Sequence, residues 1–219
     1  MVTERPEAPE RLAEALATAA RERKSITLGG AFSKNGMGGP IAPAEVKIST
    51  SALNRVRQYD PRDLTISVEA GILYRELNQI LSEHRQMLPL DPPFSHAATM
   101  GGILAANTCG PRRRLYGTAR DMIIGMKFAT LEGKLIQSGG MVVKNVAGLD
   151  MAKLMIGSFG TLAAIAVANF KLVPCPAVSR TFLLEFASAA EAFPARDGIL
   201  QSVLQPAAID LLNPAAACR

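Results

Sequence analysis

Three glycine-bearing loops hold the residues with the clearest chemical potential. They read GGAFSK at 29–34, ATMGG at 98–102 and GSFGTL at 157–162, and each is expected between a strand and a helix or between a helix and a strand. Glycine lets backbone N–H groups face a shared concavity, and a helix N-terminus adds partial positive charge. Together these features are suited to holding a diphosphate. A single such loop is more often a structural turn, and neither a G-x-G-x-x-G after a predicted strand nor a P-loop occurs.

Other polar residues give weaker signals. Arg112–Arg114 could attract an anionic substrate or a partner subunit, although a basic run is usually a solvated surface. Glu69 and Asp121 could be site carboxylates, although single carboxylates more often make structural hydrogen bonds. Cys109 has no neighbour in the sequence that would lower its pKa, so we interpret it as a small packing residue. The sequence contains no acid–base pair that could be assigned to C–H oxidation, and the catalytic residues are unknown at this stage.

The composition is that of an ordinary globular protein. The 219 residues are 48% hydrophobic and 20% charged, with 24 basic against 19 acidic residues and a net charge of +5. This mild excess suits a bound anion, but it is too small and scattered to indicate nucleic-acid binding. Three scattered cysteines and two histidines predict neither a metal site nor a disulfide framework. The charged N-terminus lacks a signal-peptide core, and no apolar run approaches membrane-spanning length, so we expect a reducing, cytoplasmic setting.

Periodicity predicts a mixed architecture. Helices are expected at 9–23, at 71–84 and at 150–157, and a further helix is expected to begin at the glycines 101–102. Asp150 is expected to cap the helix at 150–157. Strands are expected at 25–28, 46–49, 55–59, 65–70, 122–129, 134–137 and 161–173. The turn at 131–133 favours a hairpin between two of these strands, which argues for an α+β fold rather than a purely parallel sheet.

A boundary is expected at Pro174-Cys175-Pro176. Beyond it, the pattern predicts a strand at 181–186, a helix at 189–204 and a strand at 207–212. A unit of about 40 residues is small for an independent core, so we interpret residues 176–219 as the truncated start of a second domain and residues 1–175 as the first domain.

Several segments taken in order resemble one family. These are TISVEAG at 65–71, DPP followed by ATMGGILAAN within 91–107, YGTARDMIIGMKFAT at 116–130, VKNVAGLDMAKLMIGSFGTL at 143–162 and FKLVP at 170–174. They resemble the PCMH-type FAD-binding domain of the vanillyl-alcohol-oxidase superfamily, over roughly residues 20–175. Within it, the LDPP, GPRR and KNVAG segments are similar to the E subunits of bacterial glycolate oxidases.

The resemblance implies a fold of two α/β subdomains, non-covalently bound FAD and membership of a multi-subunit complex that oxidises a 2-hydroxy acid. The loop at 29–34 and the Thr99 loop would face the FAD pyrophosphate, and the remaining positions would flank the flavin or line the cofactor channel. The implied cofactor-binding residues are Gly29, Gly30, Ala31, Phe32, Ser33, Lys34, Pro92, Thr99, Met100, Gly101, Gly102, Asn107, Gly117, Thr118, Gly160, Thr161 and Ile165. His96, beside the second loop, is interpreted as a polar loop residue rather than a covalent flavin link.

The sequence departs from the family pattern at three positions. Phe32 stands where the first loop usually has a glycine, which costs freedom at positive φ and fills space. Ala163 replaces a usual glycine, and Leu149 replaces a usual tyrosine. Two alternatives therefore stay open. One is a structural or regulatory subunit that has lost FAD, and the other is a self-sufficient flavin reductase of the same superfamily. Because the region after residue 175 is short, the isolated chain is expected to need a partner for turnover.

Overall fold

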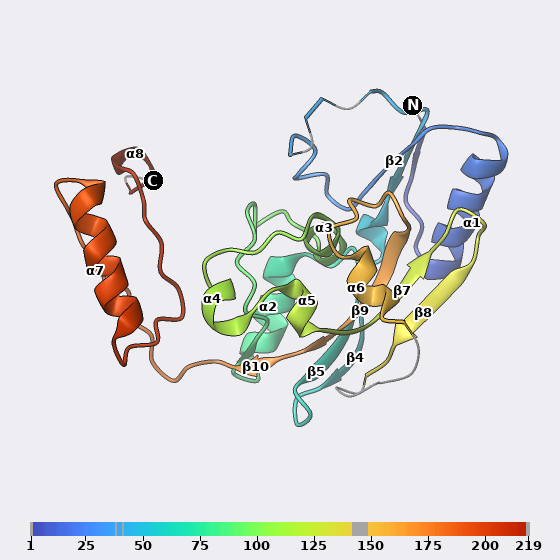
Figure 1. The fold of residues 1–219 in the computed structure, drawn as a ribbon. Coiled ribbons are helices and arrows are strands. Elements are labelled where there is room, and N and C mark those ends of the chain that lie inside the picture. Colours follow the sequence, from blue (N-terminus) through green and yellow to red (C-terminus); the bar gives the residue numbers. More distant parts are fainter. Residues whose placement is uncertain (1, 38, 41, 142–148, 218–219) are drawn as a thin grey trace.

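A computed structural model describes residues 2–37, 39–40, 42–141 and 149–217. The VKNVAG motif at 143–148 lies outside the described residues. Within them, the strands form a five-stranded, a three-stranded and a two-stranded sheet (Figure 1). This arrangement, with helices on the sheets, confirms the α+β prediction.

The largest sheet is antiparallel throughout and has the order β4-β5-β9-β7-β8. Its strands are β4 (Val56–Asp60), β5 (Thr65–Glu69), β7 (Ile123–Ala129), β8 (Leu135–Gly139) and β9 (Ala164–Lys171). The predicted hairpin between β7 and β8 is confirmed. β9 lies in the centre of the sheet and is buried on both faces, with Ile165 and Phe170 in one core cluster and Ala164 and Ala166 in the other. This double burial explains why the segment is continuously apolar rather than alternating.

Short helices and one two-stranded sheet cover one face of the large sheet. The helices are α2 (Tyr74–Ser82), α3 (Met100–Ala106), α4 (Arg113–Tyr116), α5 (Ala119–Met122) and α6 (Met151–Met155), and β6 (Gln86–Met87) pairs with β10 (Val173–Pro174). α2, α3, α5 and α6 contribute to the larger core cluster. As predicted, Asp150 caps α6: its Oδ1 accepts a hydrogen bond from the Lys153 N–H at 3.2 Å.

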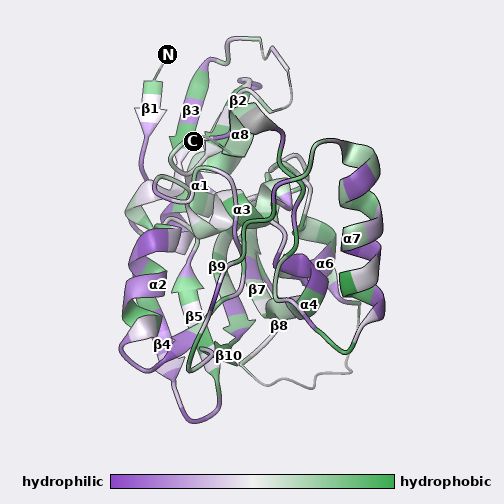
Figure 2. Ribbon diagram, turned by 90° about the vertical axis from the view of Figure 1, so that its left-hand side faces the viewer, coloured by the Kyte–Doolittle hydropathy of each residue, from purple (hydrophilic) through white to green (hydrophobic). Residues whose placement is uncertain are grey.

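The C-terminal segment lies beside this body rather than within it (Figure 1). It contains α7 (Ala189–Gln201) and α8 (Pro214–Ala217). The helix prediction at 189–204 is confirmed, but the predicted strands at 181–186 and 207–212 are wrong, because both stretches are irregular and pair with no strand among the described residues. Figure 2, in which this segment faces the viewer, shows hydrophobic residues along its extended parts. A β-prone pattern forms a strand only where another strand offers its backbone groups.

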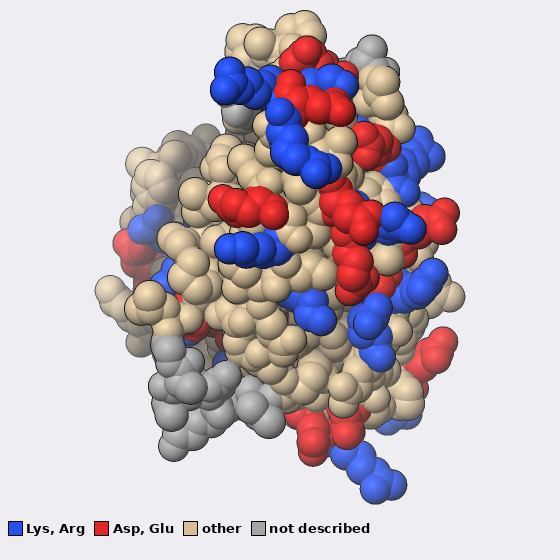
Figure 3. All heavy atoms as spheres, turned by 90° about the vertical axis from the view of Figure 1, so that its right-hand side faces the viewer, with Lys and Arg blue, Asp and Glu red and all other residues tan. Residues whose placement is uncertain are grey.

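The second subdomain is a parallel sheet with the order β1-β3-β2. It consists of β1 (Val2–Glu4), which the sequence did not predict, β3 (Val46–Ser49) with the short helix η1 (Thr50–Ala52) after it, and β2 (Ile26–Gly29). The crossover α1 (Pro9–Arg21) buries Leu12, Leu16 and Ala19 against this sheet and β9. Its outer face carries interspersed acidic and basic side chains (Figure 3). Hollows of about 700 and 520 Å³ flank α1, and neither includes a residue of the three glycine loops.

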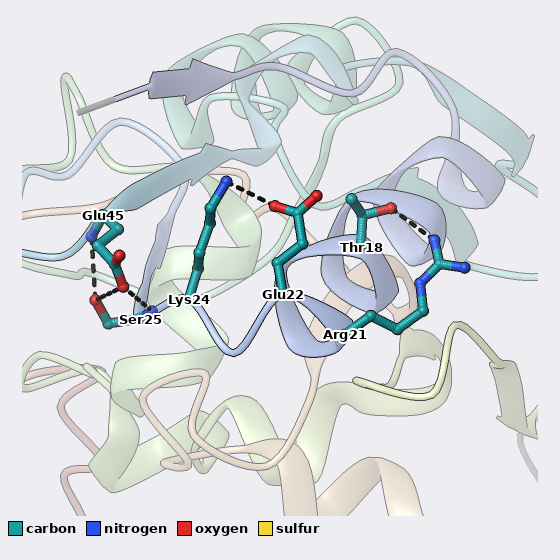
Figure 4. A network of polar contacts seen from close by, with 6 residues as sticks. All are labelled: Thr18, Arg21, Glu22, Lys24, Ser25 and Glu45. Carbon is teal, nitrogen blue, oxygen red and sulfur yellow. Dashed lines mark hydrogen bonds and ion pairs between the residues drawn. The ribbon is translucent and has the colours of Figure 1, made fainter.

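Polar contacts fix where β2 and β3 begin (Figure 4). Glu45 Oε2 accepts hydrogen bonds from the Ser25 N–H at 3.0 Å and from Ser25 Oγ at 3.2 Å, and Ser25 Oγ accepts one from the Glu45 N–H at 3.1 Å. Beside them, Lys24 Nζ lies 2.6 Å from Glu22 Oε2. The reciprocal Ser25–Glu45 pair holds the two strands in register, and so determines where the first glycine loop emerges from β2.

Among the described helices, none has both the length and the apolar character needed to cross a membrane.

Candidate functional site

The first and second glycine loops meet at Gly30 and Thr99. A Cβ added to Gly30 would clash with the Thr99 hydroxyl and methyl groups, so the Gly30 backbone lies directly against the Thr99 side chain and leaves room only for a glycine. Ser49 Oγ, at the end of β3, donates to the Gly30 carbonyl at 2.9 Å. Thr99 and Ser49 are 2% and 3% exposed, so this junction is a fixed part of the fold. Ser49 is a positioning residue that sequence reasoning missed, because its partner is set by the pairing of β2 with β3.

The two glycines of the second loop have different environments. The Gly101 N–H donates to the Ala70 carbonyl at 2.7 Å, and an added Cβ would lie 2.8 Å from the Ala70 Cβ. Gly101 therefore lets α3 pack on the end of β5. At Gly102, an added Cβ would meet only Thr99 Oγ1, at 3.1 Å. Thr99 caps α3 by accepting the Gly102 N–H at 3.3 Å. The open side of this helix start is thus at Gly102, not at Gly101.

The third glycine loop packs against the elements that border the first two loops. The Gly157 N–H donates to Leu104 O at 3.0 Å, and the Phe159 N–H donates to Ala105 O at 2.8 Å. A Cβ on Gly160 would lie 3.1 Å from Leu28 Cδ2 of β2. The loop therefore bridges the C-terminal half of α3 and the strand that leads into the first loop. The structure brings together the three loops that the sequence singled out.

Phe32 adopts the left-handed conformation that its glycine-like position demands, with φ of +56°. A non-glycine residue there costs roughly 1–2 kcal/mol. Its ring folds back over β2 and β3: Lys47 Nζ lies 3.9 Å from the ring centroid, and a Cβ added to Gly29 would be 2.7 Å from Phe32 Cε1. The ring therefore packs on the Gly29 and Lys47 side of the loop. Phe32 thus has the positive φ that a glycine would adopt readily.

Lys34, in the same loop, places an ammonium nitrogen out of solvent. Its Nζ is buried and has no hydrogen-bond partner among the described residues. Burial lowers the pKa of Lys34 below its ordinary value, because desolvation disfavours the charged form. Among the described residues, this nitrogen therefore has no anionic partner. A diphosphate has the charge and the acceptor oxygens that an ammonium group and backbone N–H groups can bind.

Several predicted site residues have other environments. Met100 and Ile165 are core residues, 0% and 5% exposed. Asp121 Oδ2 accepts both the Thr118 N–H, at 2.7 Å, and the Thr118 hydroxyl, at 2.9 Å. A Cβ on Gly117 would lie 2.7 Å from the same oxygen. The hydrogen-bond donors of Thr118 are thus occupied. That Thr118 lines the cofactor channel stays a prediction, and so does the cofactor-binding role of Ala31, Ser33, Pro92, Asn107 and Thr161.

The weaker candidates have structural roles. Buried Glu69 accepts hydrogen bonds from the Arg55 N–H at 3.0 Å and from Arg57 Nη1 at 3.1 Å. Arg57 is the extra residue where the register of β4 on β5 shifts. Burial raises the pKa of the Cys109 thiol, which therefore stays protonated and unreactive at neutral pH. Within the described ranges, no group of three or more His, Cys, Asp or Glu side chains could hold a metal ion.

Comparisons with known proteins agree with this geometry. Residues 2–139 match the family model described as "FAD binding domain". The chain is 34% identical over 171 residues to the glycolate oxidase subunit GlcE of Escherichia coli (strain K12), covering 77% of this chain and 48% of that protein. It is 32% identical over 189 residues to the mitochondrial D-lactate dehydrogenase [cytochrome] of Arabidopsis thaliana, covering 86% of this chain and 33% of that protein.

A solved structure of an alkyldihydroxyacetonephosphate synthase superimposes with a TM-score of 0.68 at 26% identity. The match covers 80% of this chain and 34% of that one. The chain therefore spans about half, or less, of the length of the relatives that it matches.

Proposed function

The chain belongs to the FAD binding domain family, and on that premise we propose that it is the cofactor-carrying part of an oxidoreductase acting on a 2-hydroxy acid. FAD is its cofactor, and the proposal concerns how FAD is held and what is oxidised. The relatives named as glycolate oxidase subunit and D-lactate dehydrogenase support this substrate class. The word "subunit" in the first of these names supports a partner protein.

The convergence of the three loops carries the proposal. Gly30, Thr99 and Gly160 come from segments 60 or more residues apart, yet Gly30 abuts Thr99 at the start of α3, and the loop of Gly160 packs on β2 and on the C-terminal half of α3. We propose that the FAD diphosphate lies beside Gly102 and the loop at 29–34. There, backbone N–H groups of the loop at 29–34 would donate to its oxygens, and the start of α3, whose first N–H groups already have acceptors in the protein, would add partial positive charge. The rest of the predicted set would complete the channel.

The departures from the family pattern do not obstruct this site. The Phe32 ring packs against Gly29 and Lys47. Ala163 is 8% exposed and belongs to the larger core cluster, so its methyl group is accommodated by packing. These two positions, together with the short C-terminal region, motivated the alternative of a subunit that has lost FAD. The environments of Phe32 and Ala163 favour retention of the cofactor.

The residues of this chain supply binding and orientation. When bound, FAD supplies two-electron redox chemistry, while the protein supplies orientation and electrostatics. Glu69 and Asp121 already accept two hydrogen bonds each, which ties both carboxylates to the scaffold. We therefore expect that the groups that bind the substrate anion, and the base that removes its hydroxyl proton or α-proton, lie outside this domain. The isolated chain should turn over glycolate or lactate slowly, if at all, until a partner is added.

The visible spectrum of the purified chain tests the proposal. Bound flavin should give a yellow protein, and acid precipitation should release the colour into the supernatant because the cofactor is held without a covalent bond. Colour in the pellet would indicate a covalent link, for which the exposed His96 is the candidate nearest the second loop. A protein that stays colourless after incubation with FAD would favour the structural subunit.

Rapid turnover by the chain alone would contradict the dependence on a partner and favour the self-sufficient flavin enzyme instead. We also propose a reducing, cytoplasmic setting, which is supported by Cys109 and Cys175 being free thiols.

A further inference from the structure

Lys34 has a buried ammonium nitrogen that is not paired with any residue the structure describes. Its Nζ has no hydrogen-bond partner among the described residues, and its side chain makes no ion pair there. Other basic side chains do form ion pairs with acidic ones. Lys24 lies 2.6 Å from Glu22, Lys153 lies 2.9 Å from Asp150, and Arg57 lies 3.1 Å from Glu69. Lys34 differs from these side chains because no acidic partner among the described residues contacts its ammonium group.

A buried, unpaired ammonium is unfavourable in the folded chain. An ion removed from water loses hydration that only a close opposite charge or several acceptors can replace. Here neither is supplied by the described residues. A lysine can usually avoid this cost by extending its flexible stem into water. The fold instead keeps this nitrogen buried.

The position of Lys34 links it to the glycine loops. It follows the left-handed Phe32, and its carbonyl accepts the Met37 N–H at 3.0 Å, which closes a turn. Four residues earlier, Gly30 is fixed by Ser49 and abuts Thr99. The cation thus belongs to the loop that also contributes to the junction at the start of α3.

We propose that Lys34 is the counter-ion of the FAD diphosphate, and that the unliganded protein carries its unpaired charge as a cost that cofactor binding removes. This inference rests on the proposed function, since it takes FAD as the ligand. It goes further by assigning opposite effects to one side chain. Lys34 destabilises the protein without FAD and strengthens the binding of FAD.

Two measurements on the purified 219-residue chain test these opposite effects. The variants are Lys34→Met, which keeps the apolar stem and removes the charge, and Lys34→Arg, which keeps a cation. Lys134→Met serves as a matched control, because Lys134 is exposed on the turn between β7 and β8. Thermal unfolding of the flavin-free proteins reports the cost of the unpaired charge. Titrations of FAD by flavin fluorescence, and of ADP by calorimetry, report diphosphate binding.

The expected result is a split between the two measurements. Without FAD, Lys34→Met should unfold a few degrees higher than the wild type. Its dissociation constants for FAD and ADP should rise about 10- to 100-fold, as expected for loss of one hydrogen-bonded charge pair. Lys34→Arg should recover most of the affinity for both ligands. Lys134→Met should match the wild type in both measurements.

Three outcomes would overturn the inference. Equal FAD affinity in Lys34→Met and the wild type would remove Lys34 from the diphosphate site while leaving the proposed function intact. A flavin-free Lys34→Met that unfolds at the same or a lower temperature would show that the charge carries no cost. A wild-type chain that binds neither FAD nor ADP would overturn the proposed function and this inference with it.

Discussion

The body of the molecule and its C-terminal segment use similar apolar residues with opposite results. In the body, Phe170 of β9 is 0% exposed because helices and strands cover both faces of that strand. In the C-terminal segment, Phe182 is 79% exposed and Val203 is 98% exposed. The difference teaches that an apolar pattern predicts a tendency to be buried, whereas burial itself depends on the surface that another element provides.

Local hydrogen bonding separates the two regions as well. The body ties its loops down with buried pairs such as Ser49 with Gly30, whereas α7 has Pro194 within the helix and an exposed pair of neighbours, Arg196 and Asp197. One bond that joins the two regions runs from Arg114 Nη1 to Pro206 O, at 3.1 Å. Matched substitutions in the two regions should therefore have very different effects.

The largest contrast is expected between two phenylalanines. Phe170→Ala removes a fully buried ring and should lower the free energy of unfolding by about 3–5 kcal/mol. Phe182→Ala removes an exposed ring and should change it by less than about 0.5 kcal/mol. Urea denaturation followed by circular dichroism measures both. Equal losses would mean that the C-terminal segment contributes to the core as much as β9 does.

A second contrast concerns two helical glycines, Gly102 in α3 and Gly198 in α7. A Cβ at Gly102 would meet only Thr99 Oγ1, and one at Gly198 would meet nothing within 4 Å, so neither substitution requires the fold to break. Gly102→Val should weaken FAD binding by more than about 100-fold, or about 2.7 kcal/mol, by filling the side proposed for the diphosphate. Gly198→Val should leave FAD affinity unchanged.

Fluorescence titration gives both dissociation constants, and circular dichroism checks that each variant is folded. A folded Gly102→Val with normal FAD affinity would place the diphosphate elsewhere.

A third contrast compares two carboxylates, Asp121 and Asp197. The Thr118 N–H and hydroxyl lower the pKa of Asp121 below its ordinary value of 3.8, because both donate to the charged form. The folded state thus binds its proton less readily than the unfolded chain. The resulting stability is fully present above pH 3.8 and is lost as the pH falls through the folded pKa.

Asp121→Asn should cost about 0.5–1 kcal/mol at pH 7, a capping contribution kept modest by solvent screening. The difference from the wild type should shrink toward pH 3. Asp197→Asn, in the C-terminal helix, should shift stability by less than about 0.3 kcal/mol. Thermal unfolding at several pH values measures these differences, and a pH-independent cost at Asp121 would argue against the carboxylate's role.

The sequence predicted those parts of the fold whose cause is local. Asp150 was predicted to cap a helix from its side-chain chemistry alone, and the buried run at 161–173 was predicted to be a strand from its composition. β1 was missed because three residues, Val2–Glu4, become a strand only through pairing with β3, more than 40 residues away. For the same reason, the expected strands near Phe182 and Leu211 did not form. Their propensity had no partner strand to satisfy.

The candidate site was predictable in its parts but not in its arrangement. Glycine chemistry indicated three anion-suited loops, and the family resemblance placed them together around FAD. Phe32 was expected to be costly at positive φ, and it does adopt φ of +56°. Where its ring points depends on Lys47, a neighbour through the pairing of β2 with β3. Long-range pairing likewise determined the roles of Ser49 and Gly101, which no pattern within either segment reveals.

The smallest effect is expected when the whole C-terminal segment is removed by ending the chain after Cys175. The body keeps its own boundary contacts: β10 pairs with β6, and the Cys175 N–H donates to Arg85 O at 2.8 Å. The deletion removes the bond from Arg114 to Pro206 and many exposed apolar side chains, including Leu183 at 80% exposure. The unfolding temperature should therefore change by less than about 2 °C. FAD affinity should be unchanged, because the three glycine loops all precede the cut. Thermal unfolding and flavin titration of the shortened chain measure both quantities. A drop of 10 °C or more would contradict a domain boundary at residue 175 and would make the C-terminal segment part of the folded body.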